Sequence, residues 1–97
     1  MLLKVQMDTE AANKMTADGS LQKAMMSMFE QLRPEAAYFS PEDGHRGAYI
    51  VFDMQDPSQM PVISEPLFQG PHAKVSFSPV MNLEDLQKGL EQAAKNR

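Results

Sequence analysis

The sequence lacks several residue types and patterns that point to particular classes of function. None of its 97 residues is cysteine, which excludes disulfides, thiolate catalysis and cysteine-based zinc sites. Its nine lysine and arginine residues are scattered and the formal net charge is -4, so the basic stripe that nucleic acid binding requires is missing. No stretch approaches the roughly 18 apolar residues of a membrane span, and no basic amphipathic helix is present. We therefore expect neither nucleic acid nor a membrane as a partner.

The start of the chain and its length favour a small cytoplasmic protein. Lys4 and Gln6 make the first residues too polar for a signal peptide, and the lack of cysteine suits a reducing compartment. A chain of 97 residues predicts a single domain over residues 1–97. Because a small domain buries a modest fraction of its surface, pairing with another subunit would bury more apolar area.

Hydrophobic periodicity predicts the order strand, helix, strand, strand, helix, strand, helix. Alternating residues favour strands, steps of three and four favour helices, and Asp18-Gly19-Ser20 predicts a break in the first helical region. A turn over 41–44 would join the second and third strands. The expected elements are strands over 2–7, 36–40, 46–53 and 73–78, and helices over 9–32, from about 58 to before Pro66, and after Asn82.

This order predicts an α+β fold of the ferredoxin-like βαββαβ type with an added C-terminal helix. Two β-α-β units that share a hairpin give a four-stranded antiparallel sheet with helices on one face. One parity of the strands is apolar, and we expect it to lie under the helices. The residues of that parity are Leu3, Val5, Met7, Phe39, Ile50, Phe52, Val75 and Phe77.

The opposite parity is mixed, which predicts a face that is covered by a partner or a ligand. Large side chains such as Tyr38 and Val51 would be wasted in water, whereas Lys4 and Gln6 need partners if they are covered. An apolar patch with a polar rim is typical of a homodimer interface and also of a ligand cavity. We favour a homodimer, since most small oligomers are two-fold dimers. Residues expected to contact a ligand on this face are Lys4, Gln6, Tyr38, Val51 and Ser76.

His45, Tyr49 and Asp53 share one parity of the third predicted strand and form the candidate catalytic set. A histidine titrates near neutral pH and can act as a base. The tyrosine could donate a hydrogen bond to a carbonyl or enolate oxygen, and the aspartate could orient either group or act as the base. A structural interpretation remains open, in which His45 is solvated in a turn, Tyr49 packs at a dimer seam and Asp53 ends the strand.

Metal and cofactor sites are not expected. His45 and His72 lack the spacing of metal ligands, and no glycine-rich phosphate loop is present. Nine methionines indicate flexible filling of the core, because Met25 and Met28 fall on one helical stripe. An adaptable apolar pocket and a soft-metal site are the alternative interpretations of the methionines.

Short motifs resemble the dimeric α/β-barrel superfamily of ferredoxin-like proteins. Pro-Glu-Ala-Ala-Tyr-Phe at 34–39, Glu-Asp-Gly at 42–44, Asp-Met-Gln-Asp at 53–56 and Glu-Pro-x-Phe at 65–68 resemble small uncharacterised bacterial members. That resemblance covers nearly the whole chain and implies a fold and a dimer.

A second resemblance covers about half of the chain. Gly-His at 44–45, Tyr-x-Val-Phe-Asp at 49–53, Pro-Leu-Phe at 66–68 and the strand-Pro element at 75–79 are similar to the muconolactone isomerase family. This resemblance implies cofactor-free proton transfer next to a lactone or enol. The long C-terminal helix and the layout of the first helical region depart from that family.

Two functional hypotheses follow. The first is a homodimeric protein that binds a small organic molecule, such as an aromatic compound or a lactone, at or near the mixed sheet face. The second is a cofactor-independent isomerase or related enzyme that acts on a lactone, phenol or quinone. A third interpretation makes the mixed face an assembly surface alone.

Overall fold

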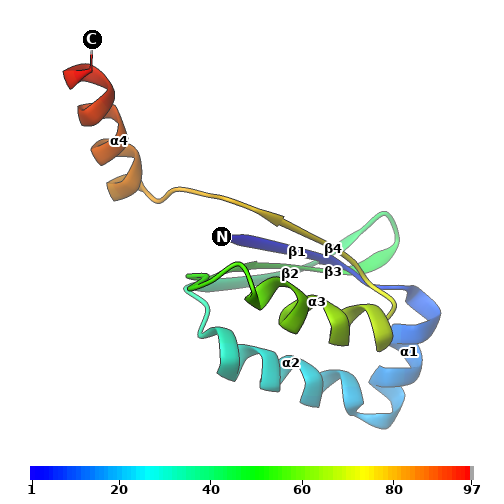
Figure 1. Cartoon of the computed structure of the whole chain (residues 1–97). Helices are drawn as coiled ribbons and strands as arrows, with labels where there is room; N and C mark the ends of the chain where they lie inside the picture. Colours follow the sequence, from blue (N-terminus) through cyan, green and yellow to red (C-terminus); the bar gives the residue numbers. More distant parts are fainter. Residues whose placement is uncertain (97) are drawn as a thin grey trace.

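A computed structural model describes residues 1–96 and shows an open antiparallel sheet with helices on both sides (Figure 1). The strand order across the sheet is β2-β3-β1-β4. The chain is therefore an α+β protein with four helices and a four-stranded antiparallel sheet. The elements in chain order are β1 (Leu2–Gln6), α1 (Thr9–Asp18), α2 (Ser20–Leu32), β2 (Ala36–Glu42), β3 (His45–Val51), α3 (Gln59–Gln69), β4 (Lys74–Ser78) and α4 (Leu83–Lys95).

The two central strands carry the core of the protein. β1 pairs with β3, so that Leu3 lies opposite Ile50 and Val5 lies opposite Ala48. Leu3 and Ile50 are fully buried, and Phe52 is 2% exposed. The expected inward parity is thus confirmed for the central strands. The buried apolar residues are Leu3, Val5, Met7, Ala12, Leu32, Ala48, Ile50, Phe52, Ile63 and Ala73.

The predicted break in the first helical region is confirmed at Gly19, whose φ of 80° ends α1 and starts α2. The Asp8 carboxylate accepts a hydrogen bond from the amide of Ala11 and caps α1. Ser20, which was expected to be the N-cap, is instead the first residue of α2. Its amide donates to the Asp18 carboxylate at 2.8 Å.

The hairpin between β2 and β3 is tighter than the sequence pattern predicts. β2 continues through Pro41 to Glu42, and the turn consists of Asp43 and Gly44, with φ values of 52° and 78°. Two residues with positive φ match the twist of a hairpin. Pro41 is tolerated because β2 is an edge strand, where a missing backbone donor is less costly. The expected turn over 41–44 and the strand end at Ser40 were therefore wrong.

β3 ends earlier than predicted and α3 ends later. β3 stops at Val51, and the amide of Phe52 donates to the carbonyl of Met1. The β1–β3 register ends with Leu2 opposite Val51, so Asp53 lies outside the sheet. α3 continues through Pro66 to Gln69. The carbonyl of Val62 loses its helical partner there, but Val62 is 62% exposed, so this part of the helix borders solvent.

Phe39, which was expected in the core, is partly exposed, and so is Phe68 of α3. Phe39 is 53% exposed and Phe68 is 44% exposed. Phe39 lies on the edge strand β2, where its ring contacts only one aromatic neighbour, Phe29 of α2, at 6.1 Å between centroids. The apolar layer under the helices therefore thins toward the β2 edge.

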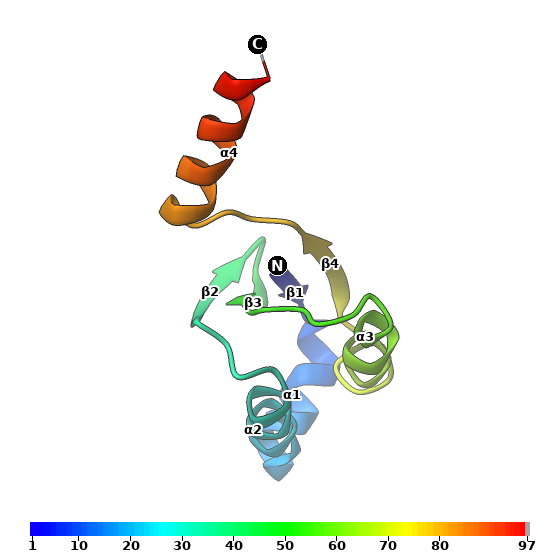
Figure 2. The ribbon, with the colours of Figure 1, turned by 60° about the vertical axis from the view of Figure 1, so that its left-hand side comes forward.

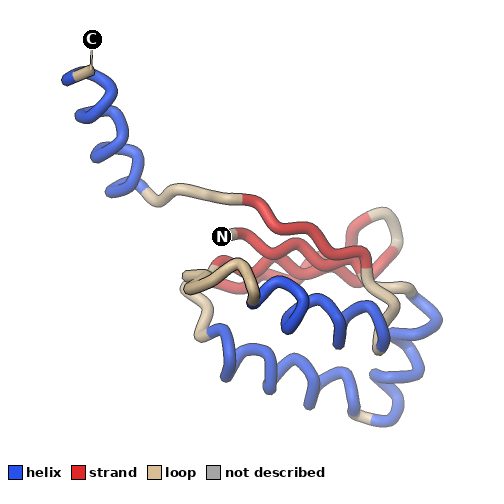
Figure 3. Tube along the Cα trace, in the orientation of Figure 1, coloured by secondary structure: helices blue, strands red, loops and turns tan. Residues whose placement is uncertain are grey.

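α4 lies apart from the other helices, which corrects the expectation that all helices cover one face. In Figures 1 and 2, α1, α2 and α3 lie on one side of the sheet, and α4 projects on the other side. Figure 3 shows the extended loop that leads from β4 to α4. Asn82 and Asp85 form a capping box at the start of α4. This agrees with the expectation that the last helix begins after Asn82. Within residues 1–96, no helix has the length and apolar character needed to cross a bilayer.

The core predicts a large loss of stability when Phe52 is truncated. Phe52→Ala should lower the free energy of unfolding by about 3–5 kcal/mol, because it removes a nearly fully buried ring and leaves a cavity. Chemical denaturation followed by circular dichroism would measure the change. Phe68→Ala is the matched control, and a loss as large as that of Phe52→Ala would contradict the observed burial.

Candidate functional site

The sheet face opposite α1, α2 and α3, here called the open face, carries a row of side chains that crosses all four strands. The pairing registers place Tyr38 opposite Tyr49, Tyr49 opposite Lys4, and Lys4 opposite Ser76. Tyr38 is 68% exposed, whereas Lys4 and Tyr49 are partly buried. Four of the predicted open-face residues therefore lie in one row across this face.

Glu42 connects the two central residues of this row. One carboxylate oxygen lies 2.9 Å from Lys4 Nζ, and the other accepts a hydrogen bond from Tyr49 Oη at 2.7 Å. The Lys4 ammonium also lies 5.7 Å from the centre of the Tyr49 ring, within the range of a cation–π contact. We call Lys4, Glu42 and Tyr49 the open-face cluster.

Glu42 was not predicted as an open-face residue, because the sequence pattern assigned it to the turn over 41–44. The signal was the period of two: Tyr38, Ser40 and Glu42 share one parity, and the strand runs through Pro41.

Gly47 lies beside the cluster and lets β2 and β3 approach each other closely. A Cβ at Gly47 would lie 2.7 Å from the Ser40 carbonyl oxygen and 3.7 Å from Glu42 Cβ, so a larger residue would force the backbone of β2 to shift.

The open-face cluster moves all three of its pKa values away from neutrality. The hydrogen bond from Lys4, followed by that from Tyr49, lowers the pKa of Glu42 from its ordinary value of 4.5. The hydrogen bond to Glu42 raises the pKa of Lys4 above 10.5 and that of Tyr49 above 10.0. A general acid or base works best with a pKa near the operating pH. At neutral pH the cluster is thus a locked ion pair with a protonated phenol.

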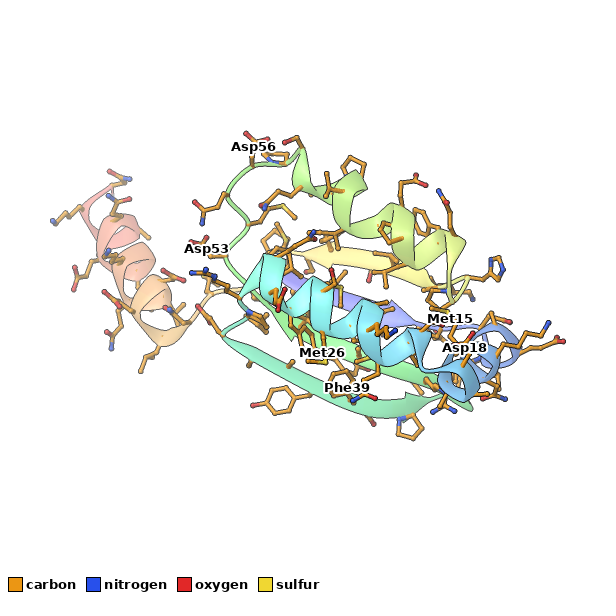
Figure 4. All side chains as sticks on the ribbon, turned by 90° about the horizontal axis from the view of Figure 1, so that it is seen from below. Met15, Asp18, Met26, Phe39, Asp53 and Asp56 are labelled. Atoms are coloured by element: carbon orange, nitrogen blue, oxygen red, sulfur yellow. The ribbon has the colours of Figure 1, made fainter. Side chains whose placement is uncertain are left out.

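The three residues of the candidate catalytic set have separate partners. Tyr49 bonds to Glu42, whereas His45 Nδ1 lies 3.0 Å from Thr9 Oγ1 at the start of α1. Asp53 accepts a hydrogen bond from the side chain of Gln55 at 2.9 Å. Figure 4 shows Asp53 in the loop that leads to α3. His45 and Asp53 therefore flank opposite ends of β3.

The side of the sheet that bears the open face holds two hollows in a single protomer. Lys4, Gln6 and Ser76, with Lys74 and Val75, line a hollow of about 170 Å³. Val51 and Asp53 line another, largely polar hollow of about 590 Å³ with Met81 near the start of α4. The expected ligand residues are thus divided between two places on this side of the sheet.

An apolar groove lies on the other side of the sheet, between α2 and α3. Its volume is about 400 Å³. Its floor is formed by Val5 of β1, by Met7, which follows β1 directly, and by Ala48 of β3. The walls are mainly apolar side chains of α1, α2 and α3. We call it the methionine groove, after Met7, Met15, Met25 and Met28, which line it.

A second hollow continues the methionine groove toward the β2–β3 hairpin and supplies polar groups. It measures about 460 Å³ and shares Met7, Leu21 and Met25 with the groove. Its far end is lined by two hydrogen-bonded pairs, His45 with Thr9 and Arg46 with Asn13. The combination is an apolar trough with a polar end.

No metal centre accompanies these sites in the described part of the chain. Among residues 1–96, no group of three or more histidine, aspartate or glutamate side chains is placed to hold a metal ion. His72 lies in the loop after α3 with a φ of 50° and is exposed. Its position agrees with the expectation of a loop residue.

The open-face cluster predicts how stability depends on pH. The pKa of Glu42 is lowered on folding, so its contribution is present above the ordinary value and is lost as the pH falls through the folded pKa. Glu42→Gln should therefore be less stable than the wild type at pH 7, and this difference should shrink below about pH 4. Urea denaturation at several pH values would measure it, with Glu65→Gln as the control. A difference that stays constant with pH would contradict the ion pair.

Comparisons with known proteins leave the function to be argued from these sites. No protein-family model, no curated protein and no solved structure matches the chain. The resemblance to dimeric α/β-barrel proteins therefore depends on its short motifs, and fold likeness by itself would not assign an activity.

Proposed function

We propose that the protein is a homodimer of the ferredoxin-like dimeric α/β-barrel type that binds a small, largely apolar organic molecule. Strand order β2-β3-β1-β4, with α1 and α2 between β1 and β2 and α3 between β3 and β4, supports the ferredoxin-like topology. The single observation that carries the binding function is the methionine groove, an apolar hollow of about 400 Å³ with a polar end.

The dimer is supported by the way the open face satisfies its own charges. Burying an unpaired charge is costly, whereas a paired and hydrogen-bonded charge can be covered. Glu42 uses both carboxylate oxygens within the open-face cluster. The neighbouring Leu2 and Val51, which face each other in the register, supply apolar area. A second copy can therefore cover this face without leaving Glu42 unpaired.

The ligand site fits the size and chemistry of a small organic molecule. Ligand pockets are mainly apolar hollows of about 300–1,000 Å³ with a few well-placed polar groups. Methionine side chains are flexible and polarizable, and they adapt to ligands of different shape. At the far end, the His45 and Arg46 side chains could hydrogen-bond a carbonyl, phenol or carboxylate. An aromatic acid, phenol or lactone meets both requirements.

The enzymatic alternative is a cofactor-independent isomerase that acts on a lactone, phenol or quinone. It needs His45, Tyr49 and Asp53 to act on one substrate, but their side chains have separate partners. The raised pKa of Tyr49 and the lowered pKa of Glu42 also leave neither group poised near neutral pH. Ligand binding is thus better supported than proton transfer.

Filling the methionine groove tests the binding function. Ala24 of α2 lines the groove, and Ala24→Phe should occupy the space of the ligand. The measurement is a thermal-shift screen against small aromatic acids, phenols, lactones and quinones. A ligand that binds should raise the melting temperature of the wild type by a few degrees when it is in excess. Ala24→Phe should abolish the shift, whereas Lys23→Phe, which adds the same ring outside the groove lining, should retain it.

A matched variant on the open face separates the two locations. Tyr49→Phe removes the hydroxyl that donates to Glu42 but leaves the methionine groove intact. The proposed groove site predicts that Tyr49→Phe keeps the ligand-induced shift. Loss of the shift in Tyr49→Phe and its retention in Ala24→Phe would move the ligand to the open face. Turnover of a bound lactone that stops in Tyr49→Phe would favour the isomerase.

A further inference from the structure

α4 carries an apolar stripe that nothing in the described chain covers. Leu83, Leu86 and Leu90 recur at steps of three and four, so they lie on one face of the helix, and they are 69%, 41% and 60% exposed. A helix of 13 residues is marginal in water when it lacks a packing partner. Yet the capping box of Asn82 and Asp85 favours helix formation. The stripe therefore calls for a surface to pack on.

That surface is not the layer formed by the chain's own helices. Only the four residues 79–82 separate β4 from α4, and they span at most about 14 Å. Figures 1 and 2 both show α4 on the side of the sheet away from α1, α2 and α3. α4 thus projects past the end of the sheet, on the side where a second copy lies when two open faces meet.

The size of the open face also calls for an additional contact. Five paired residues of β1 and four strands give a face of roughly 320 Å² in projection, at about 3.4 Å per residue and 4.8 Å per strand. A stable interface buries about 800 Å² on each partner. A helix about 20 Å long and 10 Å wide adds roughly 200 Å² in projection. α4 therefore adds more than half as much again to the projected area of the sheet face.

An apolar surface that would receive this helix lies along the edge strand β2. Phe39 is 53% exposed, and Met26 of α2 is 60% exposed. Met26 lies one turn before Phe29, whose ring contacts Phe39, and Figure 4 shows Met26 and Phe39 at the same margin of the molecule. We call Met26, Phe29 and Phe39 the edge patch.

The two edges of the sheet are brought together by two-fold symmetry. β4, which leads into α4, and β2, which carries the edge patch, are the opposite edges. A two-fold axis that runs along the strands between two facing sheets places β4 of one copy next to β2 of the other. Both copies then make the same contact, as an isologous interface requires.

From these observations we infer that the two copies of a dimer exchange their α4 helices, so that the leucine stripe of each α4 packs on the edge patch of the other copy. We call α4 in this role the exchanged arm. The inference rests on the dimer in the proposed function and adds the surface that completes it. It also gives the unpaired edge of β2 a cover, since an exposed edge strand is a site of uncontrolled pairing.

Sedimentation equilibrium of full-length variants tests the contribution of α4. The double variant Leu86→Asp/Leu90→Asp should weaken the dimer, so that its dissociation constant rises by roughly tenfold or more. Gln92→Asp places a single negative charge on the opposite side of α4 and should stay within about twofold of the wild type. Circular dichroism would verify that the sheet remains folded. An unchanged dissociation constant in the double variant would overturn the inference.

A cross-linking experiment identifies what α4 touches. The chain has no cysteine, so Leu90→Cys can be labelled at one site with a benzophenone maleimide. Labelled copies of natural isotope content are allowed to exchange subunits with unlabelled copies enriched in ¹⁵N. The expected cross-link joins residue 90 of a light chain to a heavy peptide that contains Met26 or Phe39, and Gln92→Cys should give less of it. Cross-links confined to single chains would show that α4 folds back and would overturn the inference.

The failure of this inference differs from the failure of the proposed dimer. Val51→Asp places a charge on the open face and should also dissociate the dimer. If Val51→Asp dissociates the dimer and Leu86→Asp/Leu90→Asp does not, the open-face dimer stands and the exchanged arm is wrong. A wild type that remains monomeric at high concentration would overturn both, whereas ligand binding in the methionine groove would be judged separately by Ala24→Phe.

Discussion

The apolar contact of β1 and β3 with the layer of helices determines the rest of this molecule. Leu3 and Ile50 lie opposite each other and are fully buried. Because side chains alternate along a strand, their inward direction turns Lys4 and Tyr49 outward at adjacent positions. A shift of one residue in register would bring these polar groups into the core, which makes the register strongly specified. The open-face cluster is thus a consequence of the packing on the opposite face.

The sequence predicts the elements well where local rules decide and less well where the neighbouring strands decide. The break at Gly19, the cap at Asn82 and the inward parity of Ile50 follow from conformational preference and periodicity. Pro41 was taken as the start of a turn, but a proline on an edge strand is tolerated, and edge position is a tertiary property. Asp53 was placed in β3 because the alternation continues to it, although the pairing of β3 with β1 ends with Val51 opposite Leu2.

The candidate sites show the same division. Lys4, Tyr38, Tyr49 and Ser76 could be assigned to one face from parity alone, and the registers place them in one row. Glu42 could have been added by extending the period of two through the proline. From the sequence, an adaptable apolar pocket was only an alternative interpretation of the methionines, because an apolar stripe on α2 predicts burial equally well whether α3 closes over it or not. Only the separation of α2 and α3 in space leaves Met25 and Met28 lining a hollow.

The position of β1 decides how the proposed activities relate to each other. Its inward residues Val5 and Met7, with Met7 directly after the strand, line the methionine groove, and its outward residues Lys4 and Gln6 belong to the open face. A ligand and a second copy would therefore lie on opposite sides of one central strand and would not compete for the same atoms. Any influence of ligand binding on dimerisation has to pass through β1 and its neighbours. The register of these strands is fixed by the buried face, and a close-packed core transmits small displacements. For this reason a dimer that is completed by α4 is compatible with a ligand site that each copy builds from its own residues.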